Sequence, residues 1–247
     1  MFLKSLFKNK GAATTDLSWL GTDIHSHLLP GIDDGAPDIT TSLELLKGLA
    51  NLGYKKVVTT PHVFWEMYPN TSEIIGEKEQ LLKSAAAEAG IDVAFSAAAE
   101  YFIDGHFAQQ LADKKPLRTV HDNMVLVEFS MLTAPMDLQD VLFQMQLQGY
   151  QPLIAHPERY TYLSHRPAFF DELKNSGCLF QLNLLSLTPH YGTSVQALAE
   201  YLLKQNLYDY AGTDLHRDKH LQALKTLAAS PMYARLKDSA QLKNHLL

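Results

Sequence analysis

The sequence predicts an α/β protein in which parallel strands form a closed or nearly closed barrel. Short apolar segments alternate with longer amphipathic segments about seven times, as in a parallel sheet with helical crossovers. Nearly every predicted strand also ends in a His, Glu, Asp or Asn residue. The length of 247 residues, of which 46% are hydrophobic, suffices for one large core. An open sheet is the alternative, and the strand count favours the barrel.

The predicted strands are short, and several contain Val, Ile, Phe or Tyr. They cover Thr22–Ile24, Val57–Thr60, Val93–Ala97, Met124–Phe129, Pro152–Ala155, Leu179–Leu182 and Tyr208–Ala211. We find no internal repeat, low-complexity tract or Pro/Gly-rich linker between them, so we expect a single domain.

Amphipathic or Ala/Leu/Glu/Lys-rich segments between these strands predict helices. They cover Asp38–Leu52, Ser72–Ala89, Asp137–Gln148 and Ser194–Gln205. Either Asp38 or Thr40 is expected to cap the first helix, and either Thr71 or Ser72 the second. Glycines follow several helical segments, as C-terminal capping glycines do: Gly53, Gly90, Gly149 and Gly177.

Composition and charge exclude several classes of protein. The formal net charge of −6 disfavours nucleic-acid binding, which needs a basic surface. Cys178 is the single cysteine, so no internal disulfide can form, and we expect a cytoplasmic protein. No apolar stretch is long enough to predict a membrane span. Residues 1–20 are expected to form a basic N-terminal arm, which could also contact an anionic membrane weakly, and residues 21–247 the folded domain.

Polar residues at the predicted strand ends indicate a shared site. The candidate ligands are His25, His27, His62, Glu100, Glu128, His156, Asn183, Asp214 and His216. In a parallel barrel the carboxyl ends of all strands open on one face, and His25 and His27 point to the same side of an extended segment. Divalent cations bound by imidazole and carboxylate groups would offset the cost of burying Glu100 and Glu128. We therefore predict a metal site with more than one ion.

Each of these residues alone has a simpler interpretation. A single His at a strand end is more often structural, and Asp33-Asp34-Gly35 is also a common turn sequence. It is the joint pattern that favours a metal site. The other histidines are expected to be solvated, with His190 and His220 as candidates for the mouth of the site; these are His106, His121, His165, His190, His220 and His245.

Six motifs occur in a characteristic order: DIHSHLLPGIDDG, TTPH, AAEYF, VEF, IAHPER and GTDLH. Together they span Thr22 to His220 and resemble the PHP (polymerase and histidinol phosphatase) superfamily. The IDDG and HPER elements are most similar to the bacterial protein-tyrosine phosphatases of capsule and exopolysaccharide operons, the CpsB/CapC/YwqE-like group. The resemblance implies a distorted (β/α)7 TIM-like barrel, the PHP fold, holding three divalent ions. These are commonly Mn, with Fe, Co, Zn or Mg as alternatives.

The resemblance also implies ligand sets, which can be carried over motif by motif. The first ion would take His25, His27, Glu100 and Asp214, the second Glu100, Glu128 and His156, and the third Asp34, His62 and His216. Asp23 would orient a His ligand through its other ring nitrogen.

Two sequence positions are expected to contact the phosphate. Arg159 matches an arginine of the group, and its planar guanidinium suits a phosphoryl dianion. The group often has a second arginine beyond the TDxH motif. Here that stretch reads TDLHRDKH, so Arg217, Lys219 or His220 would replace it, with Arg217 nearest by type.

The implied function is a metal-dependent protein-tyrosine phosphatase acting on the tail of a bacterial tyrosine kinase that regulates capsular or exopolysaccharide synthesis. His62, His220 or a metal-bound water would protonate the leaving phenolate. The aromatic stretch Val63–Tyr68 would either form a wall for the phenyl ring or cover the barrel rim. A cysteine phosphatase is excluded, because Leu184 stands where its C-x5-R loop needs arginine. A histidinol-phosphate-type phosphatase and a non-catalytic metal-bound scaffold are the alternatives.

Overall fold

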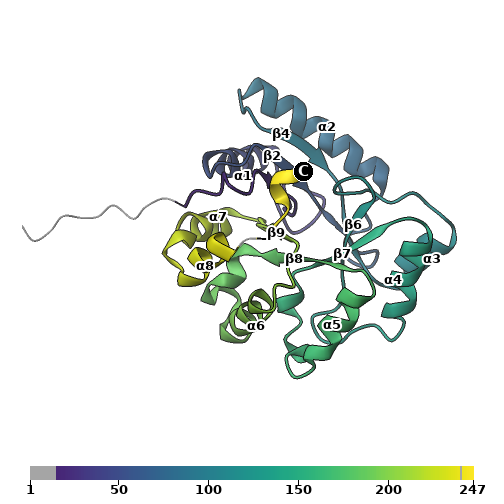
Figure 1. The fold of residues 1–247 in the computed structure, drawn as a ribbon. Helices are drawn as coiled ribbons and strands as arrows, with labels where there is room; N and C mark the ends of the chain where they lie inside the picture. The colour runs from purple at the N-terminus through teal and green to yellow at the C-terminus, as the bar shows by residue number, and fades with distance from the viewer. Residues whose placement is uncertain (1–14, 240) are drawn as a thin grey trace, which may run out of the picture.

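The computed structural model describes residues 15–239 and 241–247, in which parallel strands alternate with helices. The strands are β1 (Thr22–Asp23), β2 (Lys56–Thr59), β3 (His62–Val63), β4 (Ala94–Ala97), β5 (Glu100–Phe102), β6 (Met124–Glu128), β7 (Gln151–Ala155), β8 (Leu179–Asn183) and β9 (Tyr210–Gly212). The helices are α1 (Ile39–Asn51), α2 (Ser72–Glu88), α3 (Gly105–Ala112), α4 (Leu138–Leu147), α5 (Pro167–Asn175), α6 (Thr193–Lys204), α7 (Asp218–Lys225) and α8 (Pro231–Ser239). The helices surround the strands (Figure 1), which confirms the predicted α/β fold.

All paired strands run parallel, in two sheets of order β1-β2-β4 and β3-β5-β6-β7-β8-β9. Short breaks at residues 60–61 and 98–99 pass the chain from the first sheet to the second. The two ends of this curled assembly meet where Ser26 forms a parallel bridge with Leu215. There the Asp214 amide donates to the His25 carbonyl at 2.7 Å. The arrangement fits a TIM-like barrel.

The predicted helix caps are confirmed. Asp38 caps α1, and its side chain accepts a hydrogen bond from the Thr41 amide at 2.8 Å, so the alternative cap Thr40 is wrong. Thr71 rather than Ser72 caps α2 and accepts from the Ile74 amide. The four predicted capping glycines all have positive φ, the left-handed conformation that ends a helix.

Two apolar layers hold the strands in place. One is a buried cluster that includes Ile24, Val58, Ala98, Leu126 and Leu153, which lie in or directly after five different strands. The other is a larger cluster between the strands and the helices. Because side chains alternate along a strand, Leu126 and Glu128 share one face of β6. The apolar filling of the strand bundle therefore gives way to polar side chains at the carboxyl ends of the strands.

The ends of the chain bear on two predictions. The predicted basic arm falls outside the described residues as far as residue 14, so its role stays a prediction. The remainder of that segment is packed, with Leu17 and Leu20 buried in the larger cluster. No helix among residues 15–239 and 241–247 has both the length and the apolar character needed to cross a membrane.

Candidate metal centre

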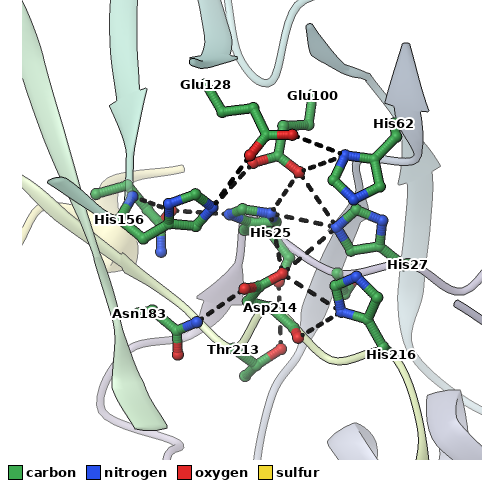
Figure 2. A network of polar contacts seen from close by, with 12 residues as sticks. His25, His27, His62, Glu100, Glu128, His156, Asn183, Thr213, Asp214 and His216 are labelled. Carbon is green, nitrogen blue, oxygen red and sulfur yellow. Dashed lines mark hydrogen bonds and ion pairs between the residues drawn. The ribbon is translucent and has the colours of Figure 1, made fainter. Parts of the chain in front are cut away.

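The predicted ligands, drawn from segments spread over most of the chain, meet at the carboxyl ends of the strands (Figure 2). His25 and His27 follow β1, His62 opens β3, Glu100 opens β5 and Glu128 ends β6. The others follow β7 and β9 or lie on the loop after β1: His156, Asp214, His216 and Asp34. His25, His27, Glu100, His156 and Asp214 are at most 2% exposed. The structure thus brings together all nine residues of the three ligand sets that the motifs imply, including Asp34.

The residues expected around the first ion face one another closely. His25 Nε2 lies 3.2 Å from Glu100 Oε2 and 3.3 Å from Asp214 Oδ1. His27 Nε2 lies 3.4 Å from each of the same two carboxylate oxygens. The two ring nitrogens are themselves 3.3 Å apart. Four donor atoms therefore surround one small volume.

The residues expected around the second and third ions lie on either side of His62. Glu100 Oε1 is 3.1 Å and Glu128 Oε2 3.8 Å from His156 Nε2, while His62 Nδ1 is 3.1 Å from both Glu100 and Glu128. On the other side, Asp34 Oδ1 is 3.5 Å from His62 Nε2 and 3.4 Å from His216 Nε2. One His62 ring thus adjoins two groups of donors.

The donor set fits divalent cations. Ligands of one ion with bonds of about 2.1 Å are separated by roughly 3.0–3.5 Å, which matches the spacing of the His25, His27, Glu100 and Asp214 atoms. Glu100 Oε2 is buried and accepts no hydrogen bond from the part of the chain that the structure describes, although three ring nitrogens lie within 3.4 Å. Neutral imidazoles and carboxylates arranged in this way are typical ligands of Mn, Fe, Co or Zn.

Mutual attraction dominates the protonation of the centre. Burial disfavours the charged form of His25, but Glu100 and Asp214 outweigh it and raise the pKa of His25 to about 9. Burial would likewise raise the pKa of Glu100, yet His25 and His62 hold that pKa well below its usual range. Without cations, these opposite charges neutralise one another.

Further side chains orient the histidine ligands. Gln181 Oε1 lies 2.8 Å from His25 Nδ1, and Asp33 Oδ2 lies 2.8 Å from His27 Nδ1. Both contacts leave Nε2 free to face the centre. Gln181 was missed in the sequence, although it lies two residues before Asn183 and so shares its face of β8.

The expected role of Asp23 is wrong. Its carboxylate does not contact a histidine ring but accepts hydrogen bonds from the Thr213 amide at 2.9 Å and the Thr213 hydroxyl at 2.7 Å. Asp23 therefore joins β1 to the segment after β9. Burial raises its pKa to about 7.

The Asp33-Asp34-Gly35 turn serves both the backbone and the site. Asp33 accepts from the Gly35 amide at 3.0 Å, as in a turn, while it also contacts His27. A side chain at Gly35 would come within 2.2 Å of the His27 carbonyl oxygen, so only glycine fits there. The two aspartates consequently face opposite sides: Asp33 toward the back of His27, and Asp34 toward His62 and His216.

Backbone strain occurs at two of the candidate ligands. His156 and Asp214 have φ values of 32° and 51°, a conformation that residues other than glycine rarely adopt. Such residues often occur at functional sites, where the surrounding structure holds them in place. Here the sharp turn after β7 leads directly into a short 3₁₀ helix, Pro157–Arg159, which carries the arginine.

Both predicted phosphate-binding arginines line a cavity of about 420 Å³ that opens onto the donor cluster. The Arg159 guanidinium donates to Asp214 Oδ2 at 3.1 Å and lies 4.9 Å above the Tyr191 ring. The Arg217 side chain is 58% exposed, 3.9 Å from Asp34 Oδ2. Arg159 is thus held in place, whereas Arg217 is mostly solvated.

Of the two histidines predicted at the mouth of the site, one lines the cavity and the other does not. His220 lines the cavity, and burial together with nearby His216 lowers the pKa of His220 to about 4. His190 does not line it but packs against the His220 ring at 5.2 Å. The prediction that His106 is solvated is wrong: its ring stacks on Trp65 at 4.1 Å, and its Nε2 is buried.

The aromatic stretch Val63–Tyr68 contributes to the cavity in part. Phe64 and Phe102 stack at 4.2 Å on its wall, and Tyr68 stacks on the His62 ring. Met67 and Met131 add apolar surface. Trp65 does not line this cavity. The cavity therefore combines a polar floor with aromatic and thioether walls.

Fold and site together define an α/β protein whose curled parallel strands fit a TIM-like barrel and whose clustered histidine–carboxylate centre suits divalent cations. The chain belongs to the CpsB/CapC family of capsular polysaccharide synthesis, which matches residues 21–239. The resemblance read from the six motifs is therefore confirmed.

Relatives in this family have been named as phosphatases. The chain is 29% identical to tyrosine-protein phosphatase YwqE of Bacillus subtilis over 80% of this chain and 78% of that protein. It is 30% identical to tyrosine-protein phosphatase CpsB of Streptococcus pneumoniae over 78% of this chain and 82% of that protein.

Solved structures with a similar fold include a member of the same group of phosphatases. A chain from the crystal structures of YwqE and CpsB, described as metal-dependent tyrosine phosphatases, superimposes with a TM-score of 0.79 at 27% identity, covering 91% of this chain and 90% of that one. The lactonase Lmo2620 from Listeria monocytogenes matches with a TM-score of 0.51 at 14% identity, covering 94% of this chain and 92% of that one. The second match concerns the fold alone.

Proposed function

We propose that this protein is a metal-dependent protein-tyrosine phosphatase. The proposal rests on one observation: the His and carboxylate cluster, Arg159 and the stacked rings of Phe64 and Phe102 all line the same cavity. Phosphotyrosine has both a dianionic phosphoryl group and a flat aromatic ring, so it matches the floor and the wall. The names of the related YwqE and CpsB proteins support the same activity.

The nine clustered side chains would hold three divalent ions, with Mn the expected metal and Fe, Co, Zn and Mg as alternatives. When bound, such ions neutralise the phosphoryl oxygens and activate the attacking water. Asp34, His62 and His216 would hold one ion, while Glu100 would be shared between the other two. The remaining ligands would divide as the motifs imply, with His25, His27 and Asp214 on one ion and Glu128 and His156 on the other.

Other residues of the cavity would act on the substrate directly. Arg159, fixed between Asp214 and Tyr191, would donate to the phosphoryl oxygens, and the exposed Arg217 would add a second positive charge. Phe64 and Phe102 would hold the tyrosyl ring so that its oxygen leaves toward the cavity mouth.

The leaving phenolate needs little acid assistance, because its pKa is about 10. His220 would donate a hydrogen bond to the leaving oxygen, and solvent at the cavity mouth would supply the proton, because His62 is assigned to a metal ion. The His220 ring is neutral near pH 7, and its Nδ1 accepts from the His216 amide at 3.4 Å. Its Nε2 therefore carries hydrogen and could donate to the leaving oxygen.

We further propose that β2 with β3, and β4 with β5, each count as one interrupted strand. This count gives the distorted (β/α)7 barrel expected from the motifs. The proposed substrate is the tyrosine-phosphorylated tail of a bacterial kinase that regulates capsular or exopolysaccharide synthesis, in the cytoplasm. The family's description supports this setting.

The test is hydrolysis of a phosphotyrosine peptide and of p-nitrophenyl phosphate after chelation and re-addition of single metals. We expect turnover to disappear on chelation and to return best with Mn. Histidinol phosphate serves as the comparison substrate, and a preference for it would favour the small-molecule alternative. Absence of metal-dependent turnover on every aryl phosphate would refute the proposal.

A further inference from the structure

A second cavity, of about 390 Å³, lies on the other face of the two short strands that carry His62 and Glu100. β3 and β5 pair in the register His62 to Glu100 and Val63 to Tyr101. Because side chains alternate along a strand, the first pair faces the metal centre, and Val63 and Tyr101 face the second cavity. The two cavities thus share one thin wall.

A tight hairpin continues this wall to the surface. The Phe64 and Tyr68 backbones exchange hydrogen bonds in both directions, which closes the Phe64–Tyr68 hairpin. On one side Phe64 stacks on Phe102 above the metal centre, and on the other Trp65 stacks on His106 in the second cavity. Asn70 secures the base by donating to the Ile32 and His62 carbonyls. A chain crossing this hairpin could reach both cavities.

One part of the wall of the second cavity is apolar. Val63, Ile75 and Tyr101 are at most 6% exposed, and Trp65 is 46% exposed at the rim. An exposed Trp beside buried apolar side chains is typical of a recognition surface rather than of a folded core. This surface would accept a large apolar group.

The floor supplies hydrogen-bonding groups. His106 and Gln110 line the cavity from successive turns of α3, and their Nε2 and Oε1 atoms are buried without a hydrogen-bond partner among the described residues. Buried polar atoms are normally satisfied, so a ligand with a polar tip would complete them once the two side chains turn toward it. Glu73 and Lys115 at the rim carry opposite charges, which favours a neutral ligand.

We propose that this cavity binds a neutral aromatic side chain with a hydrogen-bonding tip, tyrosine or tryptophan, in the peptide whose phosphotyrosine occupies the metal centre. The proposal rests on the proposed function and adds a second recognition point to it. A small aryl phosphate cannot reach across the Phe64–Tyr68 hairpin, so only peptide substrates would use the second cavity.

The first experiment compares phosphotyrosine peptides in which a single Tyr, Trp or Ala occupies each position near the phosphotyrosine. We expect one or two positions at which Tyr or Trp lowers KM about tenfold relative to Ala. Trp65→Ala and His106→Ala should abolish that preference while leaving p-nitrophenyl phosphate hydrolysis unchanged. Phe143→Ala, which removes a 56% exposed ring on α4, is the matched control and should retain the preference.

The second experiment detects binding without catalysis. Trp19 and Trp65 are the two tryptophans of the chain, so Trp19→Phe leaves Trp65 as the single indole reporter. Unphosphorylated peptide with Tyr at the preferred position should change Trp65 fluorescence in a saturable way, and the Ala peptide should not.

The outcomes separate this proposal from the proposed function. Hydrolysis of aryl phosphates with equal KM for Tyr, Trp and Ala peptides at every position would overturn the second site alone. A loss of p-nitrophenyl phosphate turnover in Trp65→Ala, equal to its loss on peptides, would also overturn it, because Trp65 would then support the shared wall. Failure of the proposed function would appear as absence of turnover on all substrates, whereas the fluorescence change would still report the second cavity.

Discussion

The Asp33 carboxylate lies 2.8 Å from His27 Nδ1, behind the ring nitrogen that faces the candidate metal centre. The same carboxylate oxygen accepts from the His62 amide at 3.1 Å. One side chain therefore positions two of the histidines. This contact also sets which His27 nitrogen is available to a cation.

Replacing Asp33 should weaken metal binding more than it weakens folding. For Asp33→Asn we expect a loss of about 10- to 100-fold in metal affinity, because the neutral amide is a weaker acceptor for His27 Nδ1 and its NH₂ group cannot accept from the backbone amides that Asp33 holds. Isothermal titration of the metal-free protein with Mn measures this directly. Asp92→Asn, at an exposed site, is the control. An unchanged affinity in Asp33→Asn would mean that the turn alone positions His27.

Arg159 should matter for turnover through the geometry of its guanidinium. We expect Arg159→Lys to lower kcat/KM on aryl phosphates by roughly 100-fold, because lysine cannot donate two parallel hydrogen bonds or stack in the same way on Tyr191. Metal content must be measured in parallel, since Arg159 also contacts Asp214. Activity within twofold of the wild type, at equal metal content, would remove Arg159 from the phosphate site.

Cys178 should be dispensable for the reaction. It is 1% exposed, and burial raises the pKa of its thiol above the ordinary 9.0. We expect Cys178→Ala to keep its turnover and the native protein to resist alkylation until it unfolds. Rapid inactivation by iodoacetamide in the native state would contradict this.

The raised pKa of Cys178 also predicts a pH dependence. Below pH 9 the thiol is protonated in both the folded and the unfolded chain, so its contribution to stability is complete. Above pH 9 the unfolded thiol ionises first, and that contribution is lost as the pH rises. Denaturant titrations at pH 8 and pH 10 should therefore show the stability difference between wild type and Cys178→Ala shrinking at the higher pH.

Asn244 should stabilise the closure of the barrel. Its buried amide donates to the Thr22 and Ala211 carbonyls and accepts from the Ala211 amide, which joins β1 to β9 at the end of the strands remote from the metal centre. We expect Asn244→Ala to lower the free energy of unfolding by about 2–4 kcal/mol, as measured by denaturant titration. Asn175→Ala, at an exposed site, should change it little. Equal effects of the two substitutions would argue against this role.

Much of the fold could be predicted because it is encoded locally. Short apolar runs located β1, β2, β4 and β6 to β9, and helical patterns located α1, α2, α4 and α6 but not α3, α5, α7 and α8. Asp38 and Thr71 act within one turn of their own helices. The ligand types at the strand ends could be read in the same way, because parallel strands deliver their last residues to one face. For this reason His25, His62 and Asp214 could be assigned to one metal site from the sequence alone.

The sequence by itself determined the parallel α/β class, the order of the motifs and the residue types available for a metal centre. Only the tertiary structure decided which of two adjacent aspartates faces His62 and which supports His27, that Asp23 holds Thr213 rather than a ring, and that Trp65 turns away from the metal centre. The physical reason is that these roles depend on the direction of a side chain relative to distant backbone. A pattern of residue types records periodicity along the chain, whereas contacts between β1, β8 and β9 arise only when the barrel closes.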